Sequence, residues 1–238
     1  MTQNIETDLT SGELLDRALS NIRHLLGNSA STLQITLEVL LENYGDFDED
    51  KKIEFIRRAA SQVDMQQHLL VSMKKYSRSV VNRVQPMNFN SFWDGWVQEK
   101  REALVQKGIQ LRVKSPEISD YIVMGEPKVL NLVLNEVIVN AMDALMGVDD
   151  PKIDLIALAS DSMRVVVRDN GKGIEQEELK KVFIPFYSKD NDSSGMGLPV
   201  IRKLLISMGG SISLDSSPDL GTSVFIKLKQ VQHNKESK

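Results

Sequence analysis

The sequence has 238 residues, of which 41% are hydrophobic and 26% charged, as expected for a globular protein of one large domain or two small ones. It contains no cysteine, which excludes disulfides, thiolate catalysis and cysteine zinc sites, and its three histidines are too few for a histidine-rich metal centre. The formal net charge of −4 argues against a general nucleic-acid binder, and no apolar run approaches the roughly 18 residues of a membrane span. Because the acidic, polar N-terminus also lacks the features of a signal peptide, we expect a cytoplasmic protein.

The N-terminal third of the sequence is patterned as two long helices. From Leu15 to Leu40, apolar residues recur at a spacing of about 3.5 residues, which is helical. This run ends at the Gly- and Asp-rich stretch NYGDFDED, and a second helical run continues from Ile53 to Tyr76. Two such helices joined by a short turn form an antiparallel hairpin that covers only part of its own apolar stripe. We therefore predict that residues 10–80 form a homodimer as a four-helix bundle.

The rest of the sequence mixes strands with helices. Residues 81–89 are predicted to be a linker, residues 90–229 a second domain, and the polar residues 230–238 a disordered tail. Within the second domain we expect helices at 90–107, 126–146 and 197–208, and strands at 109–113, 121–124, 153–160, 162–168, 211–215 and 222–228. This mixture predicts an α+β sandwich, in which a sheet carries helices on one face.

One segment of the second domain, VVVRDNGKGI, is suited to binding a nucleotide base. Asp169 ends a β-branched strand, where its carboxylate can accept a hydrogen bond from an exocyclic amino group such as that of adenine. Gly171 and Gly173 allow the backbone to approach a ligand closely. The alternative is an ordinary hairpin turn, because Asn-Gly is a strong turn signal.

Two further segments carry groups suited to phosphate and metal. In SSGMGLPVIRKLL, Gly195 and Gly197 precede an amphipathic helix whose first N–H groups attract phosphate, although a flexible loop closed by a helix cap has the same pattern. In NEVIVNAMDAL, Glu136, Asn140 and Asp143 share one stripe of an otherwise apolar helix, and such polar groups need partners. A Mg²⁺ ion with its waters would supply them, and the polar edge of an amphipathic helix is the alternative.

The order of these motifs resembles the ATP-binding fold shared by gyrase, the large heat-shock chaperones, mismatch-repair ATPases and histidine kinases. The boxes E-x-x-x-N-A, D-x-G-x-G, F-x-P-F-x-x-K and G-x-G-L follow one another within about residues 90–228. The resemblance implies that Asn140 coordinates Mg²⁺, that Asp169 binds the adenine amino group, and that Lys189 reaches the phosphates of ATP. It also implies glycines that hinge the pocket, a glycine-rich lid and a threonine on the base side. These further nucleotide-binding residues are Asp143, Gly171, Gly173, Ile174, Gly195, Met196, Gly197, Leu198 and Thr222.

The helical hairpin indicates which family of this superfamily the sequence resembles. A hairpin that bears His24 on the solvated face of its first helix, ahead of such an ATPase, resembles the dimerisation and phosphotransfer hairpin of two-component sensor histidine kinases. The resemblance implies that His24 accepts the γ-phosphoryl group of ATP and passes it to an aspartate on the receiver domain of a separate response regulator. No sensor segment is visible in this sequence, so a separate sensor protein is expected as a further partner.

The His box departs from the family pattern H-(E/D)-x-x-(N/T)-P. Leu25 replaces the carboxylate that would hold the reactive tautomer of His24, so we expect slow autophosphorylation. Asn28 is retained and is suited to orienting water, which favours phosphatase activity towards the regulator, while Ser29 replaces the proline. Glu136 stands where many histidine kinases have Asn and hydrolysing members have Glu. It is either a second magnesium-side group or a residue that supports ATP hydrolysis.

Two other interpretations remain open at the level of sequence. The chain could be an ATPase or phosphatase in which His24 is idle, which the missing carboxylate favours mildly. It could also be a phosphotransfer scaffold with a vestigial ATP site, which the intact glycine and Asn boxes argue against. The leading prediction is a two-component histidine kinase core that uses ATP and Mg²⁺.

Overall fold

The structure, a computed structural model, describes residues 11–115, 120–188 and 195–231. These residues divide into two compact units, each of which is described by itself. One unit contains the two helices up to Arg78 together with the segment Ile184–Met196, and the other contains Ser79–Phe183 and the residues from Gly197 onwards. Lys189, which the sequence places at the phosphates of ATP, lies outside the described residues.

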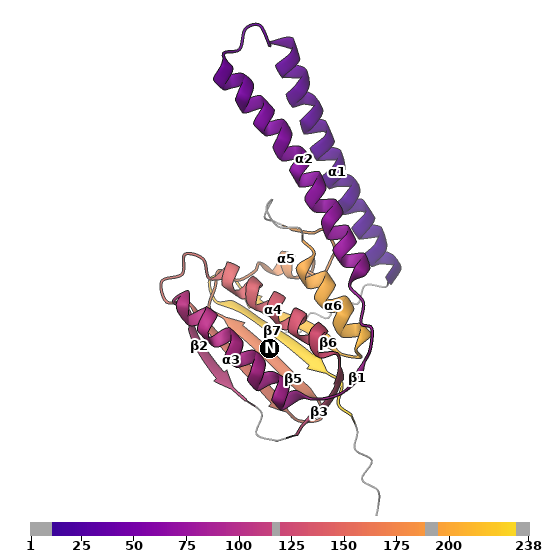
Figure 1. Cartoon of the computed structure of the whole chain (residues 1–238), viewed down its shortest axis with the longest axis vertical. Coiled ribbons are helices and arrows are strands. Elements are labelled where there is room, and N and C mark those ends of the chain that lie inside the picture. The colour runs from indigo at the N-terminus through magenta and orange to yellow at the C-terminus, as the bar shows by residue number, and fades with distance from the viewer. Residues whose placement is uncertain (1–10, 116–119, 189–194, 232–238) are drawn as a thin grey trace, which may run out of the picture. The chain divides into compact units, whose positions relative to one another are not determined.

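The first unit is built on an antiparallel helical hairpin, α1 (Ser11–Glu42) and α2 (Glu49–Arg78), shown in indigo and purple in Figure 1. Asp48 caps the second helix, because its Oδ1 accepts the Lys51 N–H at 2.8 Å. The contact between the helices is made by small, polar and a few apolar side chains. The buried residues of the hairpin are Ala18, Ser29, Thr36, Leu40, Ala59, Leu69 and Ser72.

Much of the predicted apolar stripe remains exposed in this single hairpin. On α2 the buried row, which includes Ala59, Leu69 and Ser72, lies beside the predicted stripe and does not coincide with it. The large exposed members of the predicted stripes are Leu15, Leu37, Ile53, Ile56, Val63, Leu70 and Met73. An apolar surface of this kind is a property of helices that pair with a further partner.

The second unit is a five-stranded mixed sheet with helices on one face (Figure 1). The strand order is β2-β4-β5-β7-β6, in which β2 runs parallel to β4 and the other neighbours are antiparallel. Helices α3, α4 and α6 cover the sheet, and a separate two-stranded sheet pairs β1 with β3. The bounds are β1 Gln85–Asn88, α3 Phe89–Gln106, β2 Gln110–Lys114, β3 Ile122–Gly125, α4 Pro127–Ala144, β4 Lys152–Ala159, β5 Met163–Asp169, α5 Gln176–Leu179, α6 Gly197–Ser207, β6 Ser211–Ser217 and β7 Gly221–Leu228.

The core of this unit follows from the strand alternation. On β4, Ile153 and Leu155 are completely buried, and the residues between and beside them are partly exposed, as expected for a strand with one covered face. α4 packs on β5 and β7 through its apolar side, which includes the fully buried Val133 and Leu134. The predicted α+β architecture, an N-terminal helical hairpin followed by a sheet covered by helices, is confirmed.

Two segments differ from the sequence prediction. Residues 85–88, predicted to lie in a linker, form β1 and pair with β3, and the Glu126 carboxylate accepts the N–H groups of Asn82 and Arg83 at 2.9 and 3.1 Å. A strand this short that contains proline has no detectable alternation, and proline is tolerated because β1 pairs on one side only. At the other end, Gln230 and Val231, predicted to be disordered, pair with β3.

Candidate nucleotide-binding site

Asp169 lies at the end of β5, where it is only 5% exposed. Its Oδ1 accepts two backbone N–H groups, from Gly171 at 2.8 Å and from Thr222 at 3.2 Å. Both bonds go to the same oxygen, so the carboxylate is held in one orientation and Oδ2 has no partner among the other residues that the structure describes. Burial raises the pKa of Asp169, and the two N–H groups partly oppose that rise. The site therefore presents one fixed, desolvated acceptor.

The loop after Asp169 is held tightly by its neighbours, which explains its glycines. Lys172 donates its backbone N–H to the Ala144 carbonyl at 3.0 Å, and a Cβ on Gly171 would lie 2.5 Å from that same oxygen. Gly173 has a φ of +68°, and a Cβ there would collide with the Ser217 carbonyl. Close packing therefore accounts for both glycines in this structure, and their predicted role as a pocket hinge remains a prediction.

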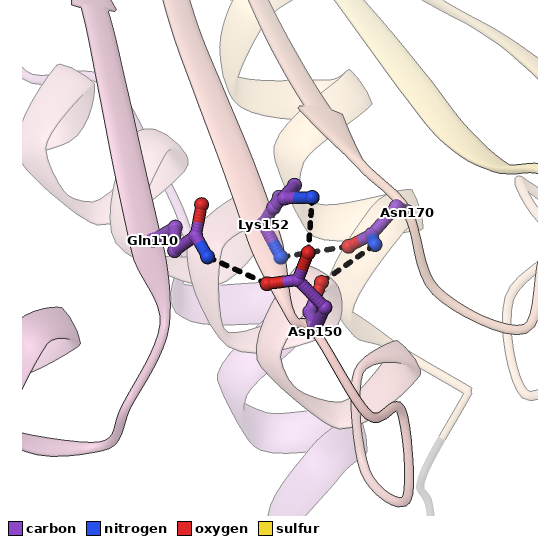
Figure 2. Close-up of polar contacts among 4 residues, drawn as sticks. All are labelled: Gln110, Asp150, Lys152 and Asn170. Atoms are coloured by element: carbon purple, nitrogen blue, oxygen red, sulfur yellow. Dashed lines mark hydrogen bonds and ion pairs between the residues drawn. The ribbon is translucent and has the colours of Figure 1, made fainter.

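Asn170, which the sequence analysis did not single out, fixes the start of this loop to β4 (Figure 2). Its Oδ1 accepts the Lys152 N–H at 2.7 Å and its Nδ2 donates to the Asp150 carbonyl at 2.8 Å. The Asp150 carboxylate in turn accepts from the side chains of Lys152 and Gln110. Both the oxygen and the nitrogen of the Asn170 side-chain amide are thus hydrogen-bonded, which fixes the residue next to Asp169.

We expect Asn170→Ala to lower both the stability of the domain and its nucleotide affinity. The change removes two side-chain bonds to backbone, each with a net contribution of about 0.5–1.5 kcal/mol. The melting temperature and the calorimetric Kd for ATP report the two effects. Gln110→Ala is the matched control, because it removes a bond to Asp150 and leaves both Asn170 bonds in place. An Asn170→Ala protein that melts and binds ATP like the control would show that this network does not position the loop.

The three polar residues predicted on α4 share one side of that helix. Asn140 and Asp143 are exposed and Glu136 is half-buried. Glu136 lies against the first residue of α6, because a Cβ on Gly197 would be 2.6 Å from Glu136 Oε1. The side chains of α4 and the N-terminus of α6 therefore border the same part of the domain.

These side chains fit a magnesium ion that is bound mainly by its substrate. All three offer oxygen donors, which Mg²⁺ prefers. Within the described ranges no three His, Cys, Asp or Glu side chains gather into a metal cage. An ion at Asn140 would therefore take most of its ligands from water and from nucleotide phosphates, as Mg²⁺ commonly does.

The remaining predicted binding residues fall into two groups. Thr222 and Ile174 lie beside Asp169: Thr222 bonds to its carboxylate, and both residues contact the buried Ser216 hydroxyl. Gly197 and Leu198 begin α6, in the same unit. Gly195, with a φ of +60°, and the buried Met196 belong to the unit of the hairpin, so the structure does not place them at the nucleotide site.

On the hairpin, His24 is exposed and its neighbour is an amide. Asn28 Nδ2 lies 3.3 Å from His24 Nδ1 and 3.4 Å from Nε2, one helical turn away. Leu25 is half-buried and brings no carboxylate to the ring. Ser29, which replaces the family's proline, is buried; it donates to the Gln62 carbonyl at 3.1 Å and accepts from the Gln66 amide at 3.2 Å. Helix α1 therefore continues without a proline break below His24.

Comparison with known families agrees with this geometry. Residues 125–232 match the family described as histidine kinase-, DNA gyrase B-, and HSP90-like ATPase. Residues 125–232 are an ATPase domain of this family. The ATPase domain follows a helical hairpin with an exposed histidine, and this combination supports a histidine kinase core.

The chain is similar to curated proteins that are named as histidine kinases. CpxA of Escherichia coli K12 is 25% identical over 235 residues, which are 96% of this chain and 49% of CpxA. The methanogenesis regulatory histidine kinase FilI of Methanothrix harundinacea is 31% identical over 227 residues, 90% of this chain and 24% of FilI. The chain thus spans about half the length of CpxA and about a quarter of FilI.

Solved structures share the fold of the ATPase domain and the hairpin. The histidine kinase ThkA, solved in complex with the response regulator TrrA, has a TM-score of 0.59 at 18% identity, covering 90% of this chain and 61% of that one. Full-length ShkA in complex with AMPPNP has a TM-score of 0.57 at 16% identity, covering 94% of this chain and 47% of that one.

Proposed function

We propose that this chain is the core of an ATP-dependent protein-histidine kinase that phosphorylates its own His24 and relays the phosphoryl group to a response-regulator aspartate. The observation that carries the proposal is the fixed carboxylate of Asp169 in the ATPase domain. It offers one free oxygen to an amino-bearing base, in the same chain as an exposed histidine. The similar proteins CpxA and FilI are both named as histidine kinases, and ThkA was solved with a response regulator.

In the proposed reaction, Asp169 Oδ2 accepts a hydrogen bond from the adenine amino group and so orients ATP. Asn140 would hold Mg²⁺, which neutralises phosphate charge during transfer. A neutral ring nitrogen of His24 attacks the γ-phosphorus, the N–P bond forms, the bond to the bridging oxygen breaks, and ADP leaves. The Asn28 amide beside the ring orients the imidazole for this attack. In a proposed phosphatase reaction, the same amide orients water against a phosphorylated regulator.

The decisive experiment is incubation of the chain with labelled ATP and magnesium. Label on the protein that is labile in acid and stable in alkali identifies phosphohistidine and supports the kinase. ATP hydrolysis without such label would favour the second candidate, an ATPase or phosphatase in which His24 is idle. Two observations favour that candidate, the leucine at position 25 in place of a carboxylate after His24 and the carboxylate of Glu136 beside the start of α6. Failure to bind ATP would leave only a phosphotransfer scaffold.

We expect Leu25→Glu to raise the autophosphorylation rate by about 10²-fold, the low end of a general-base contribution. A carboxylate next to His24 in sequence can bond to one ring nitrogen and leave the other as the nucleophile. Leu25→Gln is the matched control, since it has the same shape without the charge. The initial rate of label incorporation measures the effect. Equal rates for the two variants would show that a missing carboxylate is not what limits His24.

The hairpin is proposed to form a homodimer through residues 10–80, because its exposed apolar residues need a partner. We expect light scattering of the full chain at micromolar concentration to give a dimer. Ile56→Glu combined with Leu70→Glu should give a monomer, since these residues are 54% and 61% exposed on one side of α2. Ser61→Glu, an exposed position on the other side of that helix, is the control. A monomeric wild-type chain would contradict the proposal.

None of the helices in the described part of the chain has the length and apolar character that crossing a bilayer requires. We place the proposed reaction in the cytoplasm, where its substrate ATP is found. A separate sensor protein that controls the hairpin completes the set of proposed partners, with the homodimer and the receiver domain of the regulator.

A further inference from the structure

Ser216 is a buried hydroxyl that joins three segments of the nucleotide site. It lies in β6 and is 3% exposed. Its Oγ is 2.9 Å from the backbone N of Ile174 in the loop after Asp169, 2.8 Å from the Gly221 carbonyl, and 2.9 Å from Thr222 Oγ1. No motif in the sequence analysis included Ser216, and the reaction described above makes no use of it.

The direction of each of these bonds follows from the number of protons available. A carbonyl can only accept, so the Ser216 hydroxyl donates its single proton to Gly221. The Ile174 N–H can only donate, so it donates to Ser216 Oγ. Because the Ser216 proton is already used, the contact with Thr222 requires the Thr222 hydroxyl to be the donor. The Thr222 Oγ1 is left with lone pairs alone for any other partner.

Thr222 is at the same time part of the site around Asp169. Its backbone N–H is one of the two donors that fix Asp169 Oδ1. The Asp169 Oδ2 and the Thr222 Oγ1 are therefore both acceptors, contributed from adjacent groups. A base with an amino group can donate hydrogen bonds to these acceptors. A base with a carbonyl oxygen in that place faces two acceptors, and its oxygen receives no hydrogen bond.

We propose that Ser216 sets the base preference of this site by holding the Thr222 hydroxyl as an acceptor. Ser216 is a positioning residue, because it acts on the nucleotide through Thr222 and not by contact of its own. The inference rests on the proposed function in that it requires the site to bind ATP. Beyond that function, it assigns to Ser216 the preference of the site for a 6-amino purine over a 6-oxo purine. Without Ser216, the Thr222 proton is free to turn towards a carbonyl oxygen.

The test compares ATP with inosine triphosphate, which carries a carbonyl oxygen in place of the amino group. Calorimetric Kd values for both nucleotides give a preference ratio for each variant. We expect Ser216→Ala to reduce the preference for ATP by about tenfold, because binding of the 6-oxo base improves relative to ATP. A loss of packing alone would weaken both nucleotides by the same factor and leave the ratio unchanged.

Two Thr222 variants make the test independent of how well Ser216→Ala folds. Thr222→Ser keeps the hydroxyl and should keep the wild-type ratio, whereas Thr222→Val removes it and should reduce the ratio. Adding Ser216→Ala to Thr222→Val should reduce the ratio no further, because Ser216 acts through a hydroxyl that is already absent. A ratio that falls additively in the double variant, or stays unchanged in Ser216→Ala, would overturn the inference. A wild-type chain that binds neither nucleotide would instead overturn the proposed function.

Discussion

His24→Ala should remove all acid-labile phosphate from the chain and leave its affinity for ATP unchanged. The imidazole is the only nucleophile that the proposed transfer uses, so its loss removes the acceptor itself. The residues that fix Asp169, by contrast, all belong to the other compact unit. Labelling with ATP and magnesium measures the first quantity, and titration calorimetry measures the second.

Asn28→Ala is the matched comparison for that experiment. It removes the amide that lies 3.3 Å from the His24 ring and keeps the ring itself, so we expect it to remain labelled. Its main effect should be on removal of phosphate from the regulator, for which the amide would orient water. Label that persists in His24→Ala would place the phosphate on another residue and remove His24 from the mechanism.

Asp169→Asn should weaken ATP binding by about 10²-fold or more, as expected when a buried donor faces another donor. The two N–H groups of Gly171 and Thr222 require an acceptor at the Oδ1 position, so the amide oxygen of Asn must occupy it. The amide NH₂ is then forced to the Oδ2 position, where the adenine amino group needs an acceptor. The orientation of the substituted side chain is thus dictated by the backbone around it.

Titration calorimetry with Asp161→Asn as control tests this prediction. Asp161 is an exposed carboxylate of the same domain, and its substitution changes the charge equally at a position outside the site. A second readout is pH. Because burial raises the pKa of Asp169 and the adenine amino group requires the ionised form, the affinity should fall as the pH drops through that raised pKa. Asp169→Asn should lack this fall. Equal affinity of wild type and Asp169→Asn would remove the carboxylate from the base site.

The sequence predicted what depends on local pattern. The helices and long strands followed from apolar periodicity, and Asp169 from its place between a β-branched strand and two glycines. Ser216 and Asn170 were missed because their roles depend on distant partners: Ser216 binds Ile174 across 42 positions, and Asn170 binds Lys152 across 18. Serine is common in exposed strands, and asparagine before glycine is common in turns. Neither residue type therefore indicates a long-range contact by itself.

The free connection between helix α2 and the nucleotide domain is short. Helix α2 ends at Arg78, and the N–H groups of Asn82 and Arg83 are already bound by the Glu126 carboxylate. From Arg78 to Asn82 the chain can extend at most about 14 Å. The three residues between them supply only about six soft backbone dihedrals. In the proposed transfer, any movement between the nucleotide domain and its own hairpin would have to come from torsion about these few bonds.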